Sequence, residues 1–554
     1  MLYKIFPTTY HFKSIQFFSL LVIFSDLFYG PKKRKLNTFC AQILKPQKKI
    51  STYQTIITIM TTTMNTINDV ISEERMSGFT KYLDRAKLDN KQYQYDGVRW
   101  ILYNELRTDP VCNVRGGFIA DEMGLGKTIM MIGVLLCNFV KRTLIVVPPV
   151  LIDQWSAQIY RTTGHQALVY HGNNKKHITE EQLNRAIIVV TTYGAITLTK
   201  KQIRQKETTL LHKIEWSRAV FDEAHHLRNH KTARFYSAKK IPAKICWLIS
   251  GTPVQNKKKD FYSLCDMIKL PASFYTDHEN LRHLARAFIL KRTKASVGIE
   301  MPRLVVDKNI VAWKNRKEME LSEEIHSALA FSRINSSKID KRIVGKFQED
   351  GLLALLLRAR QTCIYPKLMA KDSAKIMSSS LYSTYAEAFN CSSKLDAATA
   401  KILERKGNGC GKLIFCHFRE EIDEVATRLK AGGMTNVASF DGRTSTSKRG
   451  DILNTGYEAL ILQIQTGCEG LNLQEKYSEI YFISPHWNPA VEDQAIARCH
   501  RIGQTKPVYV ERFEMNAFPS REEIIEEQIE TVTVDNYVGG VQDVKRYIAS
   551  RILQ

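Results

Sequence analysis

The chain has 554 residues, 25% charged and 44% hydrophobic, a balance typical of folded soluble domains and unlike that of disordered chains. At roughly 100–200 residues per domain, this length predicts two to four domains. The 80 Lys and Arg residues outnumber the 56 Asp and Glu residues, and the net charge of +24 favours a polyanionic partner; a basic protein without a nucleic-acid role is the alternative.

The first 75 residues have no clear apolar periodicity, and we predict a disordered extension over residues 1–75. The apolar run Ile15–Phe24 resembles the core of a secretory signal, but it is too short to span a bilayer and no small-residue cleavage site follows. The PKKRK cluster at 31–35 matches either a nuclear-import signal or a solvated run of charge. We therefore expect a nuclear protein, with secretion as the alternative, and no membrane helix.

From Met76 onward, short apolar runs alternate with amphipathic stretches, a pattern typical of a parallel α/β sheet. The expected strands lie at 118–119, 144–147, 187–190, 219–221 and 245–249. We predict that residues 76–290 form a first α/β lobe.

Residues 291–392 carry helical patterns and basic clusters, and we expect a helical linker or insert there. A second alternation follows, with strands expected at 413–416, 437–440, 460–464, 480–483 and 508–510. Residues 393–554 are therefore predicted to form a second α/β lobe, with a closing helix at 522–529.

The sequence DEMGLGKT, at 121–128, follows a predicted strand and opens a predicted helix. Gly124 and Gly126 allow backbone N–H groups to turn inward around a phosphate, and the helix N-terminus adds a favourable dipole. Lys127 is expected to reach the β- and γ-phosphates of ATP, and the Thr128 hydroxyl to ligate Mg²⁺. An ordinary Gly-rich turn between strand and helix is the alternative.

The sequence AVFDEAHH, at 219–226, places two acids at the end of a predicted buried strand. Asp222 is expected to hold Mg²⁺, and Glu223 to orient and deprotonate the attacking water. A DEAH tetrapeptide alone is a weak signal because acids often cap helices that follow strands. It is stronger downstream of a phosphate loop.

The sequence QAIARCHRIGQ, at 494–504, places Arg498 and Arg501 three residues apart on the same face of a predicted helix. Two guanidinium groups suit the charge that develops on a transferring phosphoryl group. A solvent-facing pair is the alternative. The second lobe shows no phosphate loop of its own, so we expect these arginines to act on ATP held by the first lobe.

From about Tyr93 to Phe513 the chain resembles the SWI/SNF-type DNA-dependent ATPases of helicase superfamily two. The matching segments, in the family's order, are YQYDGVRW (93–100), DEMGLGKT, DEAH, SGTPVQN (250–256), LLRARQTCIYPKL (356–368), KLIFCHF (412–418), DGRTS (441–445), GLNL (470–473) and HWNPAVEDQ (486–494). The resemblance implies two RecA-like lobes, with ATP and Mg²⁺ in the cleft between them and double-stranded DNA across both. It also implies that Gln94 reads the adenine and that Gln494 contributes to the nucleotide site.

The compact length, without a chromatin-reading module, is similar to the global transactivators of baculoviruses. The segment LLRARQTCIYPKL (356–368) and HWNPAVEDQ are similar to the corresponding segments of lodestar-type termination factors. Some relatives of those factors carry a zinc RING. The 11 Cys residues include no CxxC pair, so we expect no structural zinc, no disulfide framework and a reducing compartment.

Three positions depart from the patterns. Asp121 stands where the strict phosphate loop has Gly. The segment 466–469 replaces two Gly and a small apolar residue that usually precede GLNL, and Ala497 replaces an acid that usually precedes Arg498. None of these removes a predicted catalytic group.

The sequence shows no module that reads base edges, so we expect contact with DNA through phosphates and without sequence preference. The basic residues proposed for this contact are Lys141, Arg142, Lys291, Arg292, Lys448 and Arg449. The resulting hypothesis is an ATP-dependent duplex-DNA translocase that remodels protein–DNA complexes, including nucleosomes or the transcription machinery, and regulates transcription. A strand-separating helicase and a non-hydrolysing DNA-binding scaffold are the alternatives.

Overall fold

The computed structural model describes residues 71–251, 258–277, 280–327, 329, 351–370, 384–467, 471–519 and 532–553. The chain divides between Ser72 and Glu73, and every element below belongs to the part that starts at Glu73. The PKKRK cluster, the segment predicted as a closing helix at 522–529, and almost all of the predicted extension lie outside the described residues.

The first sheet has seven strands, all parallel, in the order β3-β4-β2-β5-β6-β1-β7. Their bounds are β1 (Gly116–Ile119), β2 (Thr143–Val147), β3 (Leu168–Tyr170), β4 (Ile188–Thr192), β5 (Trp216–Asp222), β6 (Ala243–Ile249) and β7 (Ile289–Leu290). The five strands predicted for this lobe are all present, and the two short edge strands β3 and β7 were not predicted.

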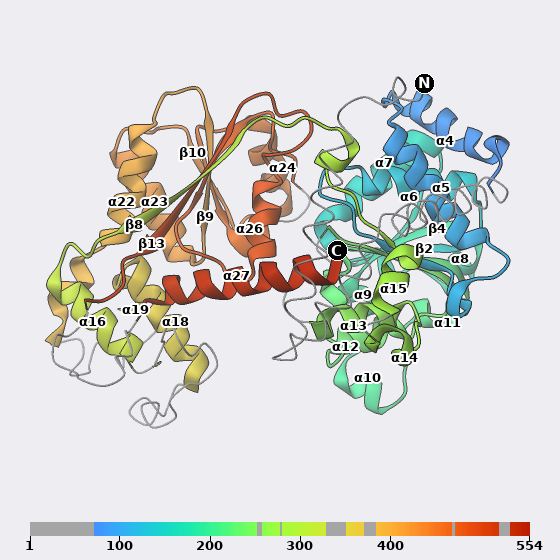
Figure 1. Ribbon diagram of the computed structural model, residues 1–554, viewed down its shortest axis with the longest axis horizontal. Coiled ribbons are helices and arrows are strands. Elements are labelled where there is room, and N and C mark those ends of the chain that lie inside the picture. The colour runs from blue at the N-terminus through green and yellow to red at the C-terminus, as the bar shows by residue number, and fades with distance from the viewer. Residues whose placement is uncertain are drawn as a thin grey trace, which may run out of the picture. The chain divides into compact units, whose positions relative to one another are not determined.

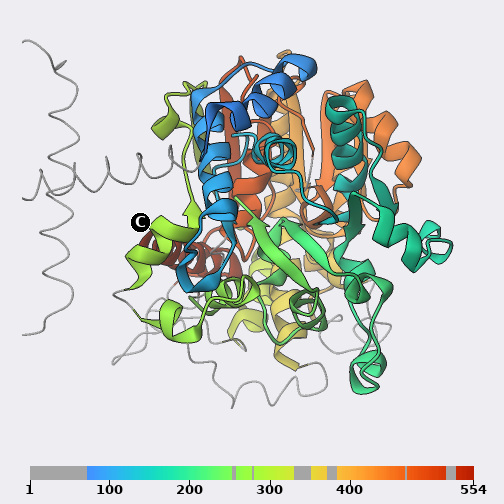
Figure 2. The same ribbon diagram turned by 90° about the vertical axis from the view of Figure 1, so that its right-hand side faces the viewer.

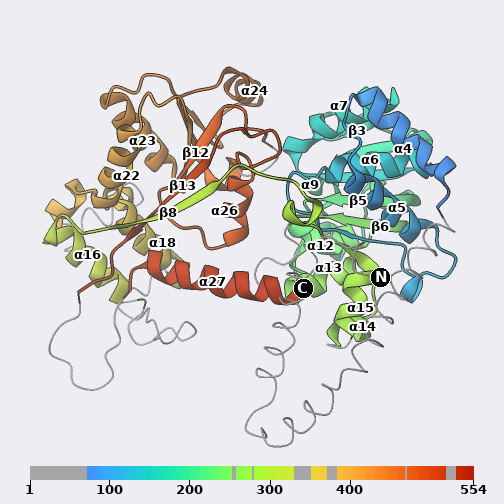
Figure 3. The ribbon, with the colours of Figure 1, turned by 45° about the horizontal axis from the view of Figure 1, so that its top comes forward.

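Helices cover the first sheet, and Figures 2 and 3 show α4 lying beside α6 and α7 in the lobe coloured blue to green. Their bounds are α4 (Glu73–Ala86), α5 (Gln92–Leu106), α6 (Lys127–Cys137), α7 (Ile152–Thr163), α8 (Glu180–Arg185), α9 (Tyr193–Ile196), α10 (Lys200–Arg204), α11 (Leu210–Lys213), α12 (Ala233–Lys239), α13 (Lys258–Met267), α14 (Ala272–Thr276) and α15 (Asn280–Phe288). The first helix of this lobe, α4, begins at Glu73, just before the predicted boundary at Met76, and it buries Met76 and Phe79 against its neighbours.

The second sheet has six strands, all parallel, in the order β10-β11-β9-β12-β13-β8. Their bounds are β8 (Leu304–Val311), β9 (Gly411–Cys416), β10 (Val437–Phe440), β11 (Ala459–Gln463), β12 (Tyr477–Phe482) and β13 (Val508–Met515). The segment 291–392, predicted as a helical linker or insert, also contains a strand at Leu304–Val311, which was not predicted. This β-branched, extended stretch forms the edge strand β8, which pairs with β13 along its whole length.

Figure 1 shows α22 and α23 on one side of the second sheet and α24 and α26 on the other. The helices of this part are α16 (Arg316–Ser327), α18 (Gly351–Ile364), α19 (Lys367–Ala370), α22 (Ser393–Glu404), α23 (Arg419–Ala431), α24 (Thr446–Thr455), α25 (Ile464–Gly467), α26 (Pro489–Ile496) and α27 (Val534–Leu553). The sequence did not predict α27, which packs against α18 and α26.

The inner strands β9, β11 and β12 of the second sheet are buried on both faces, which explains their almost continuous apolar runs. Along β9, Ile414 and Cys416 belong to one apolar cluster, whereas Leu413 and Phe415 belong to another on the opposite face. The predicted fold class, two parallel α/β sheets with helices between them in the chain, is confirmed. Among the described helices, none combines the length and the hydropathy that a bilayer crossing requires.

Candidate active site

The first sheet brings two predicted motifs to the same edge. In a parallel sheet, the carboxyl ends of the strands share one edge, and ligands bind there. The phosphate loop follows β1, DEAH begins at the end of β5, and only β6 separates these two strands. The segment SGTPVQN follows β6, but beyond Gly251 it lies outside the described residues.

The phosphate loop depends on two glycines. Gly124 and Gly126 have φ values of 94° and 82°, in the left-handed region that side chains disfavour. Gly126 is the N-cap of α6, and a Cβ built on it would lie 2.4 Å from Gln94 Nε2. The glycines therefore allow the turn and the close approach of Gln94.

The side chain of Lys127, the first residue of α6, folds back into the phosphate loop that precedes it. Its ammonium donates hydrogen bonds to the carbonyl oxygens of Asp121 at 2.8 Å and Glu122 at 3.3 Å. Burial lowers the pKa of Lys127, and the carboxylates of Glu223, Asp121 and Asp222 oppose that shift. The loop's own carbonyl groups thus hold the ammonium of Lys127 against the loop.

The two acids of DEAH are buried, and hydrogen bonds fix their geometry. Asp222 Oδ2 accepts the indole N–H of Trp155 at 2.8 Å, and Asp222 Oδ1 accepts the backbone N–H of Glu223 at 2.9 Å. Glu223 has φ 49° and ψ 49°, a left-handed conformation that is uncommon for a glutamate. Strain of this kind is typical of functional sites, where surrounding contacts maintain it.

The carboxyl groups of these two acids respond differently to their surroundings. Burial, followed by the neighbouring Glu223, raises the pKa of Asp222, whereas Trp155 lowers it. Burial would also raise the pKa of Glu223, but His225 together with the charges of Arg498 and Lys127 lowers it below its ordinary value. Glu223 is therefore ionised at neutral pH, with His225 Nδ1 lying 3.2 Å from its Oε2.

Asp121 departs from the strict phosphate-loop pattern for a visible reason. Its side chain is fully buried and accepts two hydrogen bonds from Arg292, one of them 3.1 Å long from Nε. The Arg292 guanidinium also lies over the Tyr93 ring, 5.5 Å from its centroid. The prediction that Arg292 contacts DNA is therefore wrong, because its guanidinium is bonded to Asp121 inside the first lobe.

Gln94 and Thr128 lie close to the loop. Gln94 is buried on α5 and donates a hydrogen bond to the Leu125 carbonyl at 3.1 Å. Thr128 lies in the first turn of α6 and is partly exposed.

Arg498 and Arg501 lie beyond the end of α26, so the prediction that they share a helical face is wrong. After Ile496 the chain continues in tight turns, in which Arg498 N–H donates to the Ala495 carbonyl and Cys499 N–H to the Ile496 carbonyl. Bonds of this shorter span are common where helices end. Gln494 remains inside α26 and is buried.

Both arginines nevertheless lie near the phosphate loop and the DEAH segment. The charge of Arg498 lowers the pKa of Lys127 as well as that of Glu223. A Cβ built on Gly124 would lie 3.4 Å from Arg501 Cγ. Arg498 is buried and donates to the Leu471 carbonyl at 3.5 Å, while Arg501 donates to Asn472 in the GLNL segment.

The other basic residues predicted for DNA contact fall into two groups. Lys141, Lys291 and Lys448 are exposed. Arg142 donates to Asn184 at 3.3 Å, and Arg449 donates to the Thr444 carbonyl at 2.9 Å.

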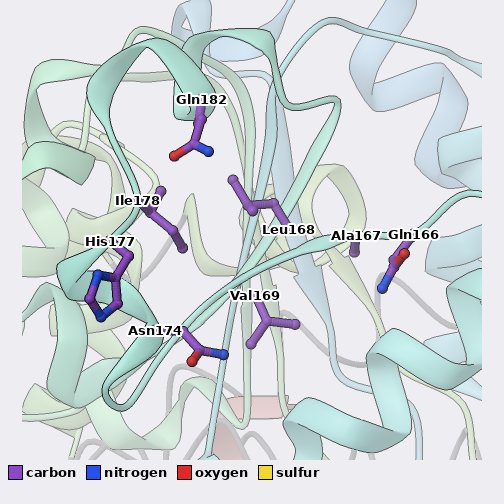
Figure 4. A pocket seen from close by; sticks show the side chains of 8 residues that line it. All are labelled: Gln166, Ala167, Leu168, Val169, Asn174, His177, Ile178 and Gln182. Atoms are coloured by element: carbon purple, nitrogen blue, oxygen red, sulfur yellow. The ribbon is translucent and has the colours of Figure 1, made fainter.

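A hollow of about 660 Å³ lies elsewhere, on the edge strand β3 (Figure 4). It is lined by Gln166, Ala167, Leu168, Val169, Asn174, His177, Ile178 and Gln182. None of the predicted site residues lines it.

Two family models match the chain: an SNF2-related domain at residues 93–368 and a helicase conserved C-terminal domain at residues 393–503. The chain belongs to the SNF2-related family. It is therefore an enzyme of the ATP-hydrolysing, helicase-like class, built on two RecA-like lobes, as the motifs predicted.

Relatives of this SNF2-related chain include a probable global transactivator of Orgyia pseudotsugata multicapsid polyhedrosis virus, 26% identical over 76% of this chain and 85% of the relative. An ATP-dependent helicase of Mycoplasma genitalium is 29% identical over 78% of this chain, which spans 40% of that longer protein. A solved structure, the Sulfolobus solfataricus SWI2/SNF2 ATPase core in complex with double-stranded DNA, is 23% identical over 78% of this chain and 89% of that chain, with a TM-score of 0.35.

Proposed function

We propose that this SNF2-related chain is a DNA-dependent ATPase that translocates on duplex DNA, remodels protein–DNA complexes and regulates transcription in the nucleus. The observation that carries the catalytic part is the meeting of Lys127, Asp222 and Glu223 at one sheet edge, within range of the charge on Arg498. We propose functional lobes at 76–290 and 393–554, with the segment 291–392 between them.

The residues of the first lobe fit ATP and Mg²⁺. Carboxylate and hydroxyl oxygens suit Mg²⁺, and each oxygen of Asp222 keeps a lone pair after accepting its one observed hydrogen bond. We therefore assign the ion to Thr128 and Asp222. When bound, Mg²⁺ supplies charge neutralisation at the β- and γ-phosphates.

The remaining groups have separate roles. The Gly124–Gly126 backbone and Lys127 bind the phosphates, and Gln94 and Gln494 contribute to nucleotide binding. Glu223 orients the attacking water and accepts its proton, because it is ionised and lies beside the phosphate loop. Arg498 and Arg501 stabilise charge on the phosphoryl group. Arg498 suits this role, since its Nε is buried and has no hydrogen-bond partner within the described residues.

Replacement of Glu223 tests this assignment. Glu223→Gln should retain ATP binding and lower kcat by roughly 10²–10⁴-fold, the usual contribution of a general base. Glu215→Gln, an exposed position just before the same strand, is the matched control and should retain the parent rate. ATP turnover by Glu223→Gln at the parent rate would show that another group accepts the proton.

Duplex DNA as the activating ligand is supported by family membership and by the net charge of +24. The ATPase rate should rise with duplex DNA, increase with duplex length and vary little between unrelated sequences. Because phosphate contacts release counterions, log K should fall with log salt by about 0.9 per phosphate neutralised. Stimulation by single-stranded RNA alone, or tight binding to one sequence, would contradict the proposal.

Two assays separate translocation from its alternatives. A third strand paired to a duplex should be displaced with ATP while the duplex stays closed, whereas a strand-separating helicase would open a forked duplex.

The PKKRK cluster supports nuclear import, so a reporter fused to residues 1–50 should enter the nucleus. Cytoplasmic retention of that reporter would remove this support.

A further inference from the structure

Trp155 contacts a residue of the proposed metal site directly. The indole Nε1 lies 2.8 Å from Asp222 Oδ2. Both groups are shielded from water, with relative exposures of 1% for Trp155 and 7% for Asp222. A hydrogen bond between a neutral donor and a buried carboxylate is stronger than one in water.

We propose that Trp155 is a positioning residue for magnesium, whose indole N–H fixes the Asp222 carboxylate in the orientation that holds the ion. The inference rests on the metal-holding role proposed above for Asp222. The second oxygen, Oδ1, is fixed by the backbone N–H of Glu223. Together the two donors set the plane of the carboxylate and leave one lone pair on each oxygen.

The position of Trp155 in the fold keeps the donor in place. Trp155 lies in the first turn of α7, which follows β2, and β2 pairs directly with β5, where Phe221 lies opposite Val146. The helix α7 packs against α4, α6 and β4. The indole is almost fully buried beside these elements, which restricts its movement, and a rigid donor is what orients a metal-binding carboxylate.

Two other buried tryptophans in this lobe show what a purely structural indole does. The N–H of Trp216 donates to the Leu211 carbonyl at 2.8 Å, and that of Trp247 to Glu105 Oε1 at 2.8 Å. A buried tryptophan N–H needs an acceptor, and both have one outside the active site. Trp216 is as deeply buried as Trp155 and so provides a matched control.

The test measures binding of a fluorescent ADP analogue in Mg²⁺ and in EDTA, and compares the gain in affinity that the metal gives. In Trp155→Phe this gain should fall roughly tenfold or more, the loss expected when the partner of a metal-binding side chain is removed. Trp216→Phe should keep the full gain. Affinity in EDTA should stay close to that of the parent chain, which a general loss of folding would not allow.

A double-mutant cycle separates this inference from the proposed function. Asp222→Ala should abolish the metal-dependent gain, and adding Trp155→Phe should then change nothing further. Loss of the gain in Asp222→Ala but not in Trp155→Phe would overturn the role of Trp155 alone. A full gain in Asp222→Ala would overturn the metal role of Asp222 and this inference with it.

A second replacement guards against a packing defect in Trp155→Phe. Benzothienylalanine at position 155 keeps the two fused rings and exchanges the N–H for sulfur. The same reduced gain with this side chain supports the hydrogen bond as the cause. A full gain would overturn it.

Discussion

Arg292 forms a two-point contact with Asp121, the residue that replaces glycine at the start of the phosphate loop. Asp121 is fully buried, whereas the Arg292 side chain is 17% exposed. The carboxylate would be costly in that position without its partner, because an isolated buried charge loses its hydration. The departure at Asp121 and the arginine far along the chain therefore form one unit.

Removal of Arg292 should destabilise this lobe and weaken ATP binding. We expect Arg292→Met to lower the free energy of unfolding by roughly 3 kcal/mol, as when one partner of a buried pair is removed, and to raise KM for ATP. Thermal unfolding and steady-state kinetics measure the two effects. Asp121→Asn added to Arg292→Met should recover part of the stability, and Lys175→Met, at an exposed position of the same lobe, should change neither quantity.

Arg501 should affect turnover more than ATP binding. An arginine that contacts the transferring phosphoryl group contributes roughly 10³–10⁵ in rate in other nucleotide hydrolases. We therefore expect Arg501→Ala to reduce kcat strongly while the affinity for ATP changes little. Single-turnover kinetics with an equilibrium ATP-binding assay can separate the two. Arg303→Ala, an exposed arginine before β8, is the control, and a normal kcat in Arg501→Ala would refute the assignment.

Glu421 makes the stability of the second lobe dependent on pH. It is buried at the start of α23, and burial raises its pKa to about 7, although Lys394 and Arg360 oppose the shift. Because the folded pKa lies above the ordinary glutamate value of about 4.5, the stability linked to Glu421 is full below pH 4.5 and is lost as pH rises through about 7.

Glu421→Gln should remove that loss, because an amide does not ionise. Relative to Glu421→Gln, the parent chain should lose of the order of 3 kcal/mol between pH 4.5 and 8, at about 1.4 kcal/mol per pKa unit. Unfolding measured at several pH values checks this. Glu420→Gln is the control, and a parallel pH dependence in Glu421→Gln and the parent would contradict the shift.

Residues before Glu73 should be dispensable for ATP hydrolysis, whereas α4 should not. A chain beginning at Glu73 or at Met76 should keep the parent ATPase rate. The first keeps the contact between Glu73 and Arg99 at 2.8 Å, and both keep the buried residues Met76 and Phe79. A chain beginning at Leu88 loses all of α4 and should fold poorly. Full activity of that shorter chain would show that α4 is not part of the lobe.

The sequence predicted the strands of the fold where a continuous apolar run marked them. Strands buried on both faces, such as β2 and β9, have continuous apolar runs and were predicted near their true positions. The edge strand β8 is mostly exposed, and Asp307 and Lys308 interrupt its apolar pattern, so it could not be recognised before its partner was known. The short edge strand β3 has a similarly weak pattern.

The candidate site was predictable where local spacing determines chemistry, as for Lys127, Asp222 and Glu223. Trp155 was missed and Arg292 was assigned to DNA contact, because the observed roles of both depend on contacts across long sequence separations. One signal for Trp155 was present, since it shares the apolar face of an amphipathic helix with Ile152 and Ile159, and a buried indole N–H needs an acceptor. Nothing near Arg292 in the sequence distinguishes it from its exposed neighbour Lys291.

The pairing of β8 with β13 has a consequence for synthesis on the ribosome. Leu304 pairs with Val508, and Val311 with Met515, so β8 emerges long before the strand that it joins. At roughly 5–20 residues per second, the delay is roughly 10–40 s. During that time the edge strand is exposed to other chains and to chaperones, and the last sheet contact of the second lobe forms only after β13 has been made.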